Sequence, residues 1–308
     1  MSALHGRHEP GTGEYRVGDG AVELTRYHYV SDVAQLESPR PYLHPLRTRA
    51  GHLVSLYRPW DHVWHKGITW SLPHLGPDNF WGGPTFVRGE GYRQLENDGS
   101  MDTVEVTSAT EGTAEELRFT HRLRWTTQRG EQVVAEERTL GFRLVDDATW
   151  ALTFSTAMKN VSGAGIAIGS PTTAGRDNAG YGGLFWRGPR SFTDGTVLAP
   201  QGDGGDELRG QRAAWMGFTG RHDEVDAASS LVFVDAADNP RHPPQWFVRS
   251  EQFAAVCPAP FFSEELPFAA GSTLRFRYAV VIADGSAEGS RGRELAQVGR
   301  DVLAAGLS

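Results

Sequence analysis

Long runs in which apolar and polar residues alternate are the feature that most constrains the fold of this chain. In residues 117–125, LRFTHRLRW, one face of an extended chain carries Leu, Phe, Leu and Trp, and the other carries mainly Arg and Thr. The same period of two returns in residues 150–158 and, most clearly, in residues 272–282. This period is typical of antiparallel strands with one buried and one exposed face.

The segments between these runs predict how the strands are connected. Residues 128–130 form a turn, and residues 132–144 return as the partner strand of 117–125. Adjacent glutamates on that partner strand, Glu136 and Glu137, must face opposite ways, so at most one points inward. Further strands are expected at residues 21–29, 231–234 and 246–256, and only the tail, with Leu295, Val298, Val302 and Leu303, has helical spacing. The chain shows no βαβ rhythm, which predicts an all-β fold: a large antiparallel β-sandwich with a short C-terminal helix.

Domain organisation follows from composition along the chain. Residues 1–20 are polar and rich in glycine, and we expect a flexible N-terminal segment there. Residues 21–308 show neither a repeat of fixed period nor a linker, and are expected to form a single β-sandwich domain. Residues 160–215 are rich in Gly and Asp and predict loops of the kind that line a site on a rigid sheet.

Charge and composition exclude several classes of function. The formal charge of −8 and the pI near 5.8 argue against a nucleic-acid partner or an anionic membrane surface, because both require a basic face. The one cysteine, Cys257, allows neither an intrachain disulfide nor a thiolate metal cluster. No run of about 18 apolar residues occurs, and the N-terminus lacks the apolar core of a signal peptide. We therefore expect a soluble, cytoplasmic protein; its oligomeric state is left open.

The segment Tyr42–Trp81 is the richest in residues that can perform chemistry. It holds five of the eleven histidines, four tryptophans and several polar side chains, among many prolines that exclude a long helix. Neutral imidazole exchanges protons near neutral pH or binds a metal. The catalytic candidates are His44, His62 and His65, with Asp61 placed to orient one imidazole.

Several common motifs are missing from the sequence. There is no G-x-G-x-x-G after a strand, no P-loop, no H-E-x-x-H and no G-x-S-x-G, so a dinucleotide, a nucleoside triphosphate and the usual hydrolase sites are not indicated. His62 and His65 form an H-x-x-H, which on a flat strand would place the rings on opposite faces. As an alternative to metal-free chemistry, His44, His62 and His65 could hold a divalent metal.

Polar and aromatic residues elsewhere are candidates for binding a small carbohydrate. Flat aromatic rings beside hydrogen-bonding groups suit a sugar, and arginine or lysine suits a carbonyl or carboxylate oxygen. Some candidates follow the histidine segment, another pair lies in or after a Gly-rich loop, and a last pair lies among prolines. The predicted substrate-binding residues are Lys66, Asn79, Trp81, Tyr181, Arg187, Asn239 and His242.

These runs also resemble a known family. The chain is similar to a bacterial family that carries the label methane oxygenase PmoA, or PmoA-like, over about residues 22–285. The motifs that carry the resemblance, in chain order, are RPYLHPLRTRAG, DHVWHKGITW, NFWGG, EERTL, GYGGLFWRGP, AAWMGFTG, DNPRHPPQWFVR and GSTLRFRYAVVIADG. One departure stands out: where the family usually has D-H-P-H-H-R-G, this chain has Trp64 in place of the middle histidine and Lys66 in place of arginine.

The resemblance implies a fold more than a reaction. Such proteins look like members of the mutarotase-like β-supersandwich group and accompany sugar oxidoreductases in carbohydrate catabolism. The label itself does not transfer, because a membrane oxygenase subunit would need apolar spanning helices. Three functions therefore stay open. The favoured one is an epimerase, isomerase, lyase or hydrolase that uses histidine acid/base chemistry. Its substrate would be a sugar or an oxidised sugar. The others are a non-catalytic carbohydrate-binding or regulatory protein and a histidine-ligated metal enzyme.

Overall fold

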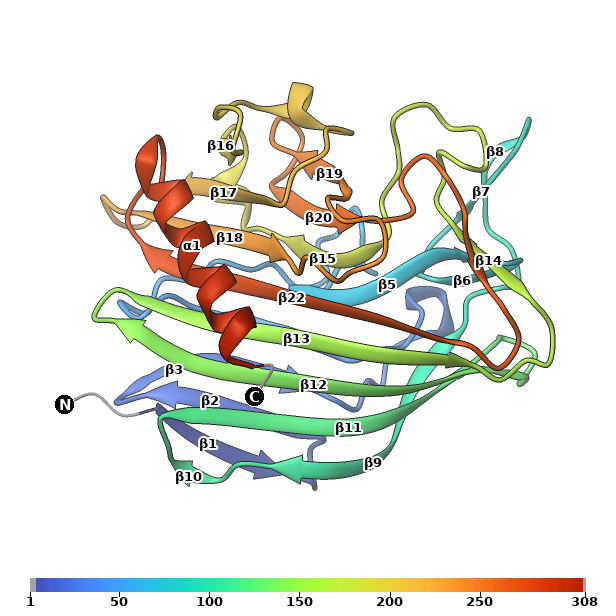
Figure 1. The fold of residues 1–308 in the computed structure, drawn as a ribbon, viewed down its shortest axis with the longest axis horizontal. Coiled ribbons are helices and arrows are strands. Elements are labelled where there is room, and N and C mark those ends of the chain that lie inside the picture. The colour runs from blue at the N-terminus through green and yellow to red at the C-terminus, as the bar shows by residue number, and fades with distance from the viewer. Residues whose placement is uncertain (1–3, 307–308) are drawn as a thin grey trace.

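The computed structural model describes residues 4–306, which form two large antiparallel sheets packed face to face (Figure 1). The predicted antiparallel β-sandwich is confirmed. The first sheet has twelve strands, and nine of them run in the order β10 (Gly112–Thr113), β1 (Leu4–Glu9), β2 (Glu14–Asp19), β3 (Val22–His28), β4 (Tyr42–Leu46), β5 (Ile68–Leu75), β15 (Gly183–Arg187), β20 (Ala255–Ala259) and β19 (Gln245–Arg249). Three shorter strands attach beside β5: β6 (Asp78–Phe80), β14 (Ile166–Gly169) and β21 (Leu266–Phe268).

The second sheet contains the long strands that the alternating runs predict. Its eight strands run in the order β16 (Thr196–Leu198), β17 (Trp215–Arg221), β18 (Ala228–Asp235), β22 (Thr273–Asp284), β13 (Thr149–Asn160), β12 (Gln132–Asp146), β11 (Glu116–Thr126) and β9 (Ser100–Ala109). A separate ribbon pairs β7 (Thr85–Val87) with β8 (Gly91–Arg93), and short 3₁₀ turns occur at Gln35–Glu37, Arg190–Phe192 and Asp206–Leu208. The register Phe119↔Leu140↔Phe154 places buried side chains opposite one another across three strands.

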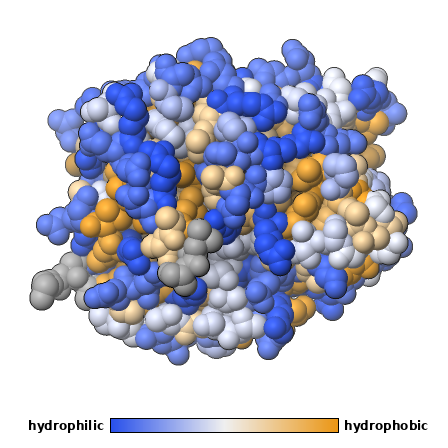
Figure 2. All heavy atoms as spheres, in the orientation of Figure 1, coloured by the Kyte–Doolittle hydropathy of each residue, from blue (hydrophilic) through white to orange (hydrophobic). Residues whose placement is uncertain are grey.

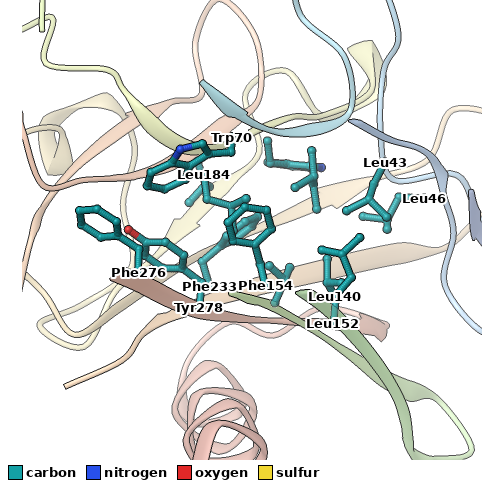
Figure 3. Packing of buried hydrophobic residues seen from close by; sticks show 14 of the residues in the cluster. Leu43, Leu46, Trp70, Leu140, Leu152, Phe154, Leu184, Phe233, Phe276 and Tyr278 are labelled. Carbon is teal, nitrogen blue, oxygen red and sulfur yellow. The ribbon is translucent and has the colours of Figure 1, made fainter. Parts of the chain in front are cut away.

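The core fills the space between the two sheets (Figure 3). The first sheet contributes Leu43, Trp70 and Leu184, and the second contributes Leu152 and Phe276 among others. These side chains come from alternate positions of their strands, which is why a period of two in the sequence identifies them. Burial of apolar surface at about 25 cal/mol per Å² makes this layer the main source of stability.

The interior also encloses one polar network. Arg138 donates to both carboxylate oxygens of Glu136, at 2.7 and 2.9 Å, and to the hydroxyl of Tyr27 at 3.2 Å. The Tyr27 hydroxyl lies 3.0 Å from Nε2 of His121, whose Nδ1 lies 2.8 Å from Thr103 Oγ1. Glu136 points into the core while Glu137 lies outside with a side chain 56% exposed, as their adjacency on one strand predicts.

The C-terminal helix α1 (Ser290–Ala305) packs on the outer face of the second sheet, across β22 and β18. Its buried side chains, such as Leu295 and Leu303, contact Val232 and Val281 in a separate apolar cluster. Gly299 allows the close approach, because a Cβ there would lie 2.6 Å from Val234 Cγ2. The predicted C-terminal helix is confirmed. Residues 4–306 contain no helix long and apolar enough to cross a membrane, and Figure 2 shows a mainly hydrophilic surface on this face, with apolar atoms visible between the polar side chains.

The prediction of a flexible segment over residues 1–20 is wrong for the part that the structure describes. Strands β1 and β2 pair with each other, and β2 continues into β3, so the N-terminus joins the first sheet. Leu4, Tyr15 and Val17 belong to the core. Polar composition suggested flexibility here, but the charged residues of these strands form ion pairs such as Arg16–Glu14. Residues 1–3 lie outside the described part.

Candidate functional site

The outer face of the first sheet carries a second set of side chains that the core does not use. On β15, Leu184 and Trp186 point into the core, so the residues between and after them, Phe185 and Arg187, lie on the opposite face. Strand β19 repeats this pattern with Phe247. Antiparallel sheets commonly leave one face to solvent. Here that face carries aromatic rings, which form the floor of a cavity.

The cavity has a volume of about 320 Å³, within the range of small-molecule sites. Aromatic rings form most of its wall, together with two histidines and two arginines. The lining residues are His62, Trp64, His65, Trp81, Gly82, Pro84, Tyr92, Arg176, Tyr181, Phe247, Arg249, Gln252 and Phe253. They come from segments that lie far apart in the sequence. The predicted candidates His62, His65, Trp81 and Tyr181 meet here.

Arg187 fixes the proton position of His65. The side chain of Arg187 is fully buried, and its Nη1 lies 3.1 Å from Nδ1 of His65. A guanidinium has no acceptor, so it donates to Nδ1, which assigns the proton of the neutral imidazole to Nε2. Burial, followed by the charges of His62 and Arg187, holds the pKa of His65 well below its usual value. His65 therefore presents a neutral ring with an N–H donor at the cavity.

His62 has the complementary arrangement. Its ring stacks on that of His65 with centroids 4.7 Å apart and planes inclined by 17°. Asp61 Oδ2 lies 3.2 Å from Nδ1 of His62, an ion-pair distance at which the N–H direction is not aligned for a hydrogen bond. The carboxylate favours the proton on Nδ1 and leaves Nε2 with a free lone pair. Burial lowers the pKa of His62, and Asp61 partly offsets that effect.

Asp61 is held in turn by arginines. Arg190 Nη2 donates to its Oδ1 at 2.6 Å, and Arg187 Nη2 lies 3.9 Å from its Oδ2. Burial alone would raise the pKa of Asp61, but a hydrogen bond from its own backbone, the adjacent His62 and the charge of Arg187 bring that pKa below the usual value. Arg187 stacks on Phe253 at 3.8 Å and keeps Nε and Nη2 buried without a hydrogen-bond partner. The predicted residues Asp61 and Arg187 thus adjoin the histidine pair.

Asn79 shapes the cavity from behind. It is buried, its Nδ2 donates to Gly83 O and Thr85 Oγ1, and its Oδ1 accepts from the backbone N–H groups of Trp81 and Gly82. With both donors and both acceptor positions occupied, Asn79 positions Trp81 instead of contacting a ligand as predicted. The turn needs glycine: Gly83 has φ of +69°, and a Cβ on it would lie 2.7 Å from the Trp64 ring. Trp64 forms part of the wall.

Lys66 points away from the cavity. Its side chain is fully buried, with Nζ 3.3 Å from Glu37 Oε2, and Arg58 donates to both oxygens of Glu37 at 2.9 and 2.7 Å. Burial, and after it the charge of the neighbouring Arg40, lower the pKa of Lys66 to about 7, while Glu37 acts in the opposite direction. Lys66 therefore forms a buried ion pair instead of the predicted ligand contact. It directly follows His65 in the sequence, and its side chain points to the opposite side of the chain.

His44 also lies outside the cavity. It stacks on Tyr57 with centroids 5.5 Å apart, and its Nδ1 lies 2.8 Å from Ser55 Oγ. Burial lowers its pKa to about 4. In the described part of the chain no three His, Cys, Asp or Glu side chains are grouped to hold a metal ion, so His44, His62 and His65 do not assemble as the ligand set of the metal alternative.

Asn239 and His242 form a separate cluster. His242 Nδ1 lies 2.7 Å from Asp235 Oδ2, and Asn239 Nδ2 donates to Asp235 Oδ1 and to Arg277 O, both at 2.7 Å. Burial raises the pKa of Asp235 to about 6. These contacts tie the end of β18 to β22. Neither residue lines the cavity, so the prediction that this segment closes the site is not met by the structure.

Nine of the thirteen lining residues were not among the site residues predicted from the sequence. Tyr92, Arg176 and Gln252 come from loops or short strands in which nothing local indicates a site. Phe247 and Arg249 did carry a signal: in QWFVR on β19 they alternate with Trp246 and Val248, so one set had to face away from the core. An outward-facing aromatic beside an arginine is the pattern that identifies them.

A second hollow, of about 190 Å³, lies on the other sheet between β11–β13 and the end of α1. Each of its arginines is paired with a carboxylate: Arg118 and Arg143 lie 3.1 and 3.0 Å from Glu116, and Arg277 lies 2.7 Å from Asp238. It contains no histidine among the residues that line it. The cavity on the first sheet is therefore the better candidate, because it combines orphaned buried donors with titratable groups.

Comparison with known proteins gives a family but no activity. The model of a family of unknown function, DUF6807, matches residues 14–297. A comparison with curated proteins found no match. The family description names no oxygenase and no sugar, so the resemblance to the PmoA-like family stays a prediction.

Solved structures with a similar fold are sugar-active proteins at low identity. A proposed kojibiose phosphorylase from the human microbiome is 8% identical with a TM-score of 0.38; 98% of this chain is covered, but only 33% of that one. A proposed aldose 1-epimerase from Klebsiella pneumoniae is 11% identical with a TM-score of 0.38, covering 93% and 80%. The GalM/aldose epimerase homologue from C. elegans is 8% identical with a TM-score of 0.32, covering 92% and 99%. This chain thus spans about a third of the phosphorylase, and these values assign it no reaction.

Proposed function

The chain belongs to the family of unknown function DUF6807, and we propose that its cavity binds a small carbohydrate on which His62 and His65 perform acid/base chemistry of the epimerase or isomerase type. One observation carries the proposal: of two stacked imidazoles at the cavity, one has Asp61 beside its Nδ1 and the other has Arg187 beside its Nδ1, an arrangement that favours opposite tautomers. A structural pair would not need a carboxylate on one ring and a guanidinium on the other.

The two imidazole rings have different roles in the proposed reaction. Nε2 of His62, with its free lone pair, takes a proton from a hydroxyl or an activated C–H of the sugar, and the imidazolium that forms is stabilised by Asp61. Nε2–H of His65 donates a hydrogen bond to the oxygen on which negative charge develops, and keeps its proton. His62 then returns the proton to the substrate, so the enzyme ends the cycle unchanged.

The walls suit a sugar ring. Trp81 contacts His65 at 5.8 Å and Tyr181 at 4.6 Å between ring centroids, so an aromatic wall extends directly from the histidine pair. Aromatic faces stack on the C–H side of a sugar while polar groups around them bond its hydroxyls. The non-catalytic alternative would use the same walls but would not need the tautomer arrangement.

The test is turnover and binding in matched histidine variants. Sugars that raise the melting temperature are first identified from a panel of aldoses, uronates and sugar phosphates; a ligand at a hundred times its Kd adds about 2.7 kcal/mol. Interconversion of the ligands found is then followed by NMR in D₂O. We expect His62→Gln to lose about 10²–10⁴ in rate with Kd nearly unchanged.

His44→Gln is the control, because His44 is a half-buried histidine outside the cavity and should keep full turnover. Full activity of His62→Gln would overturn the proposal. Binding without turnover of any ligand would favour the carbohydrate-binding alternative. Exhaustive chelation should leave turnover unchanged, because neither proton transfer uses a metal ion; a loss restored by one divalent ion would favour the metal enzyme.

A further inference from the structure

The charge of the cavity is opposite to that of the whole protein. The chain carries a formal charge of −8, yet the residues that line the cavity include Arg176 and Arg249 and no Asp or Glu. Arginine presents a planar fork of donors that matches carboxylate and phosphate oxygens. A neutral sugar would not need two such cations at one wall.

The guanidinium of Arg249 is only partly hydrogen-bonded. Its side chain is 16% exposed, its Nη1 donates to Gln252 Oε1 at 3.1 Å, and its Nε is buried without a hydrogen-bond partner. The nearest carboxylate, Asp206, lies 3.7 Å away. That carboxylate is already engaged, because Arg209 and the backbone N–H of Ser250 both donate to it. Arg249 therefore lines the cavity without a hydrogen-bonded carboxylate.

Arg176 is held by an aromatic ring instead of an acid. Its guanidinium lies 4.8 Å from the centroid of the Tyr92 ring and donates to the Tyr92 hydroxyl. Tyr92 in turn lies 2.8 Å, oxygen to oxygen, from the hydroxyl of Tyr181. No carboxylate of the described residues forms an ion pair with Arg176. Arg176 and Arg249 both line this one cavity.

The order of contacts along the cavity separates these arginines from the histidines. Trp81 contacts His65 on one side and Tyr181 on the other. Tyr181 then contacts Phe247, with ring centroids 5.4 Å apart, and its hydroxyl is hydrogen-bonded to the hydroxyl of Tyr92. Phe247 contacts Arg249, and Tyr92 contacts Arg176. A ring stacked on Trp81 and Tyr181 would thus have one end at the imidazoles and the other at the guanidiniums.

We propose that Arg176 and Arg249 form a subsite for the acidic group of the ligand, so that the cavity takes an anionic carbohydrate: a sugar bearing a carboxylate or a phosphate monoester. This inference rests on the proposed carbohydrate site and adds the charge of its substrate. The sugar ring lies against the aromatic wall, the acidic group accepts hydrogen bonds from the guanidinium groups of Arg176 and Arg249, and the reacting carbon or hydroxyl lies at His62 and His65.

Calorimetry with matched ligands tests the subsite. The probes are D-glucose, D-glucuronate and D-glucose 6-phosphate, and the same three forms of D-galactose, at 50 mM and 300 mM salt. We expect at least one acidic form to bind about 10- to 100-fold more tightly than its neutral parent, the gain given by hydrogen bonds to a charged group. High salt should reduce this preference. Comparing uronate with phosphate distinguishes the two acidic groups.

Variants locate the preference. Arg176→Gln and Arg249→Gln should each remove most of it while leaving the affinity of the neutral parent unchanged, and Arg122→Gln, an exposed arginine on β11, should keep it. Equal affinity for neutral and acidic forms, no binding of any acidic form, or a preference that survives both substitutions would overturn the inference.

The two proposals fail separately. An acid preference in a protein that turns over no sugar supports the subsite and contradicts the acid/base function. Turnover of a neutral sugar lost in His62→Gln, with no preference for its acidic forms, does the reverse. Thermal shift with inorganic phosphate and acetate shows whether an anion alone is held; stabilisation as large as that by the sugar acids would contradict a role for the aromatic wall.

Discussion

The protein buries two arginines on strands of its two sheets, and they differ in how completely they are bonded. Arg138, 1% exposed, contacts both oxygens of Glu136 and the Tyr27 hydroxyl. Glu136 also accepts from Trp125 Nε1 and Thr156 Oγ1, each at 2.7 Å. Arg187, fully buried, donates to one imidazole nitrogen and leaves Nε and Nη2 without a partner.

The difference separates structure from binding. Buried polar groups in folded proteins are nearly always hydrogen-bonded, since an orphaned one costs about 1–3 kcal/mol. The network at Arg138 is complete, and its direction runs from Arg138 through Tyr27 and His121 to Thr103, which donates to Tyr29 O at 2.7 Å. The group at Arg187 is incomplete and borders a cavity. Incompleteness of this kind is maintained where a ligand supplies the missing partners.

The largest expected effect comes from breaking the complete network. Arg138→Met should lower the free energy of unfolding by about 3–5 kcal/mol, because it leaves the carboxylate of Glu136 buried without its cation. Urea denaturation monitored by tryptophan fluorescence measures the change. Arg122→Met, on the exposed side of β11 with a side chain 57% exposed, is the control and should change stability by at most about 0.5 kcal/mol. Two equally stable variants would remove the contrast.

Two buried histidines sharpen the comparison. His121→Gln should cost about 1–3 kcal/mol at pH 7.5, because it breaks the bonds to Tyr27 and Thr103. His65→Gln should cost less, because only Arg187 bonds its ring. Urea midpoints of both variants and the parent protein give the values. A larger loss for His65→Gln would contradict the ranking.

The same histidines set a pH dependence. Burial lowers the pKa of His65 in the folded state, so below the usual value of about 6.5 the unfolded state binds more protons. Stability is therefore present above about pH 6.5 and is lost as the pH falls, by up to about 1.4 kcal/mol per pH unit for each such group. His65→Gln should show a shallower loss between pH 7 and 5 than the parent protein; an unchanged slope would mean that His65 stays neutral in both states or charges without cost.

Arg187→Met should have a smaller effect on stability. An apolar side chain of similar length removes one hydrogen bond and also the cost of two buried, unpaired donor groups, and Asp61 keeps Arg190. We expect the free energy of unfolding to change by at most about 1 kcal/mol, in either direction, while ligand affinity falls. A loss as large as that of Arg138→Met would show that Arg187 is a structural residue.

The sequence predicts the fold well because its signals are local. Alternation along β11 and β22 depends only on neighbouring residues, and so does the opposite facing of Glu136 and Glu137. Asp61, His62 and His65 were candidates because of their local grouping, but the stacking of the two rings is visible only in the structure. Lys66 and Asn79 were placed at the ligand because their type suits it, but their partners, Glu37 and the backbone after residue 80, become visible only in three dimensions.

The arginine wall illustrates what one sequence withholds. Arg176 lies in a loop and Arg249 lies at the end of β19. The two residues are 73 positions apart in the sequence, and only the sheet order brings their segments to one cavity. Conversely, Asn239 and His242 are of residue types that suit a binding site, but their side chains are already hydrogen-bonded to Asp235 and Arg277. Residue type indicates what a side chain can bond; the fold decides whether those bonds are already made.

Lys66 is intermediate between the two arginines, and the smallest effect is expected there. Its Nζ has an ion partner in Glu37 but no hydrogen bond, and Glu37 keeps Arg58 when Lys66 is removed. Lys66→Met should therefore change stability at pH 7 by less than about 1 kcal/mol.

The pH dependence of the stability is more informative. Because burial lowers the pKa of Lys66 to about 7 in the folded state, against about 10.4 when unfolded, the unfolded state binds more protons between these values. The parent protein should then gain stability as the pH rises from 7 to 10, and Lys66→Met should lack that gain. Thermal unfolding across this pH range, with Lys159→Met on the exposed side of β13 as the matched variant, measures it. Parallel curves for the parent and Lys66→Met would show that Glu37 keeps Lys66 charged, and would place this ion pair with the complete network at Arg138.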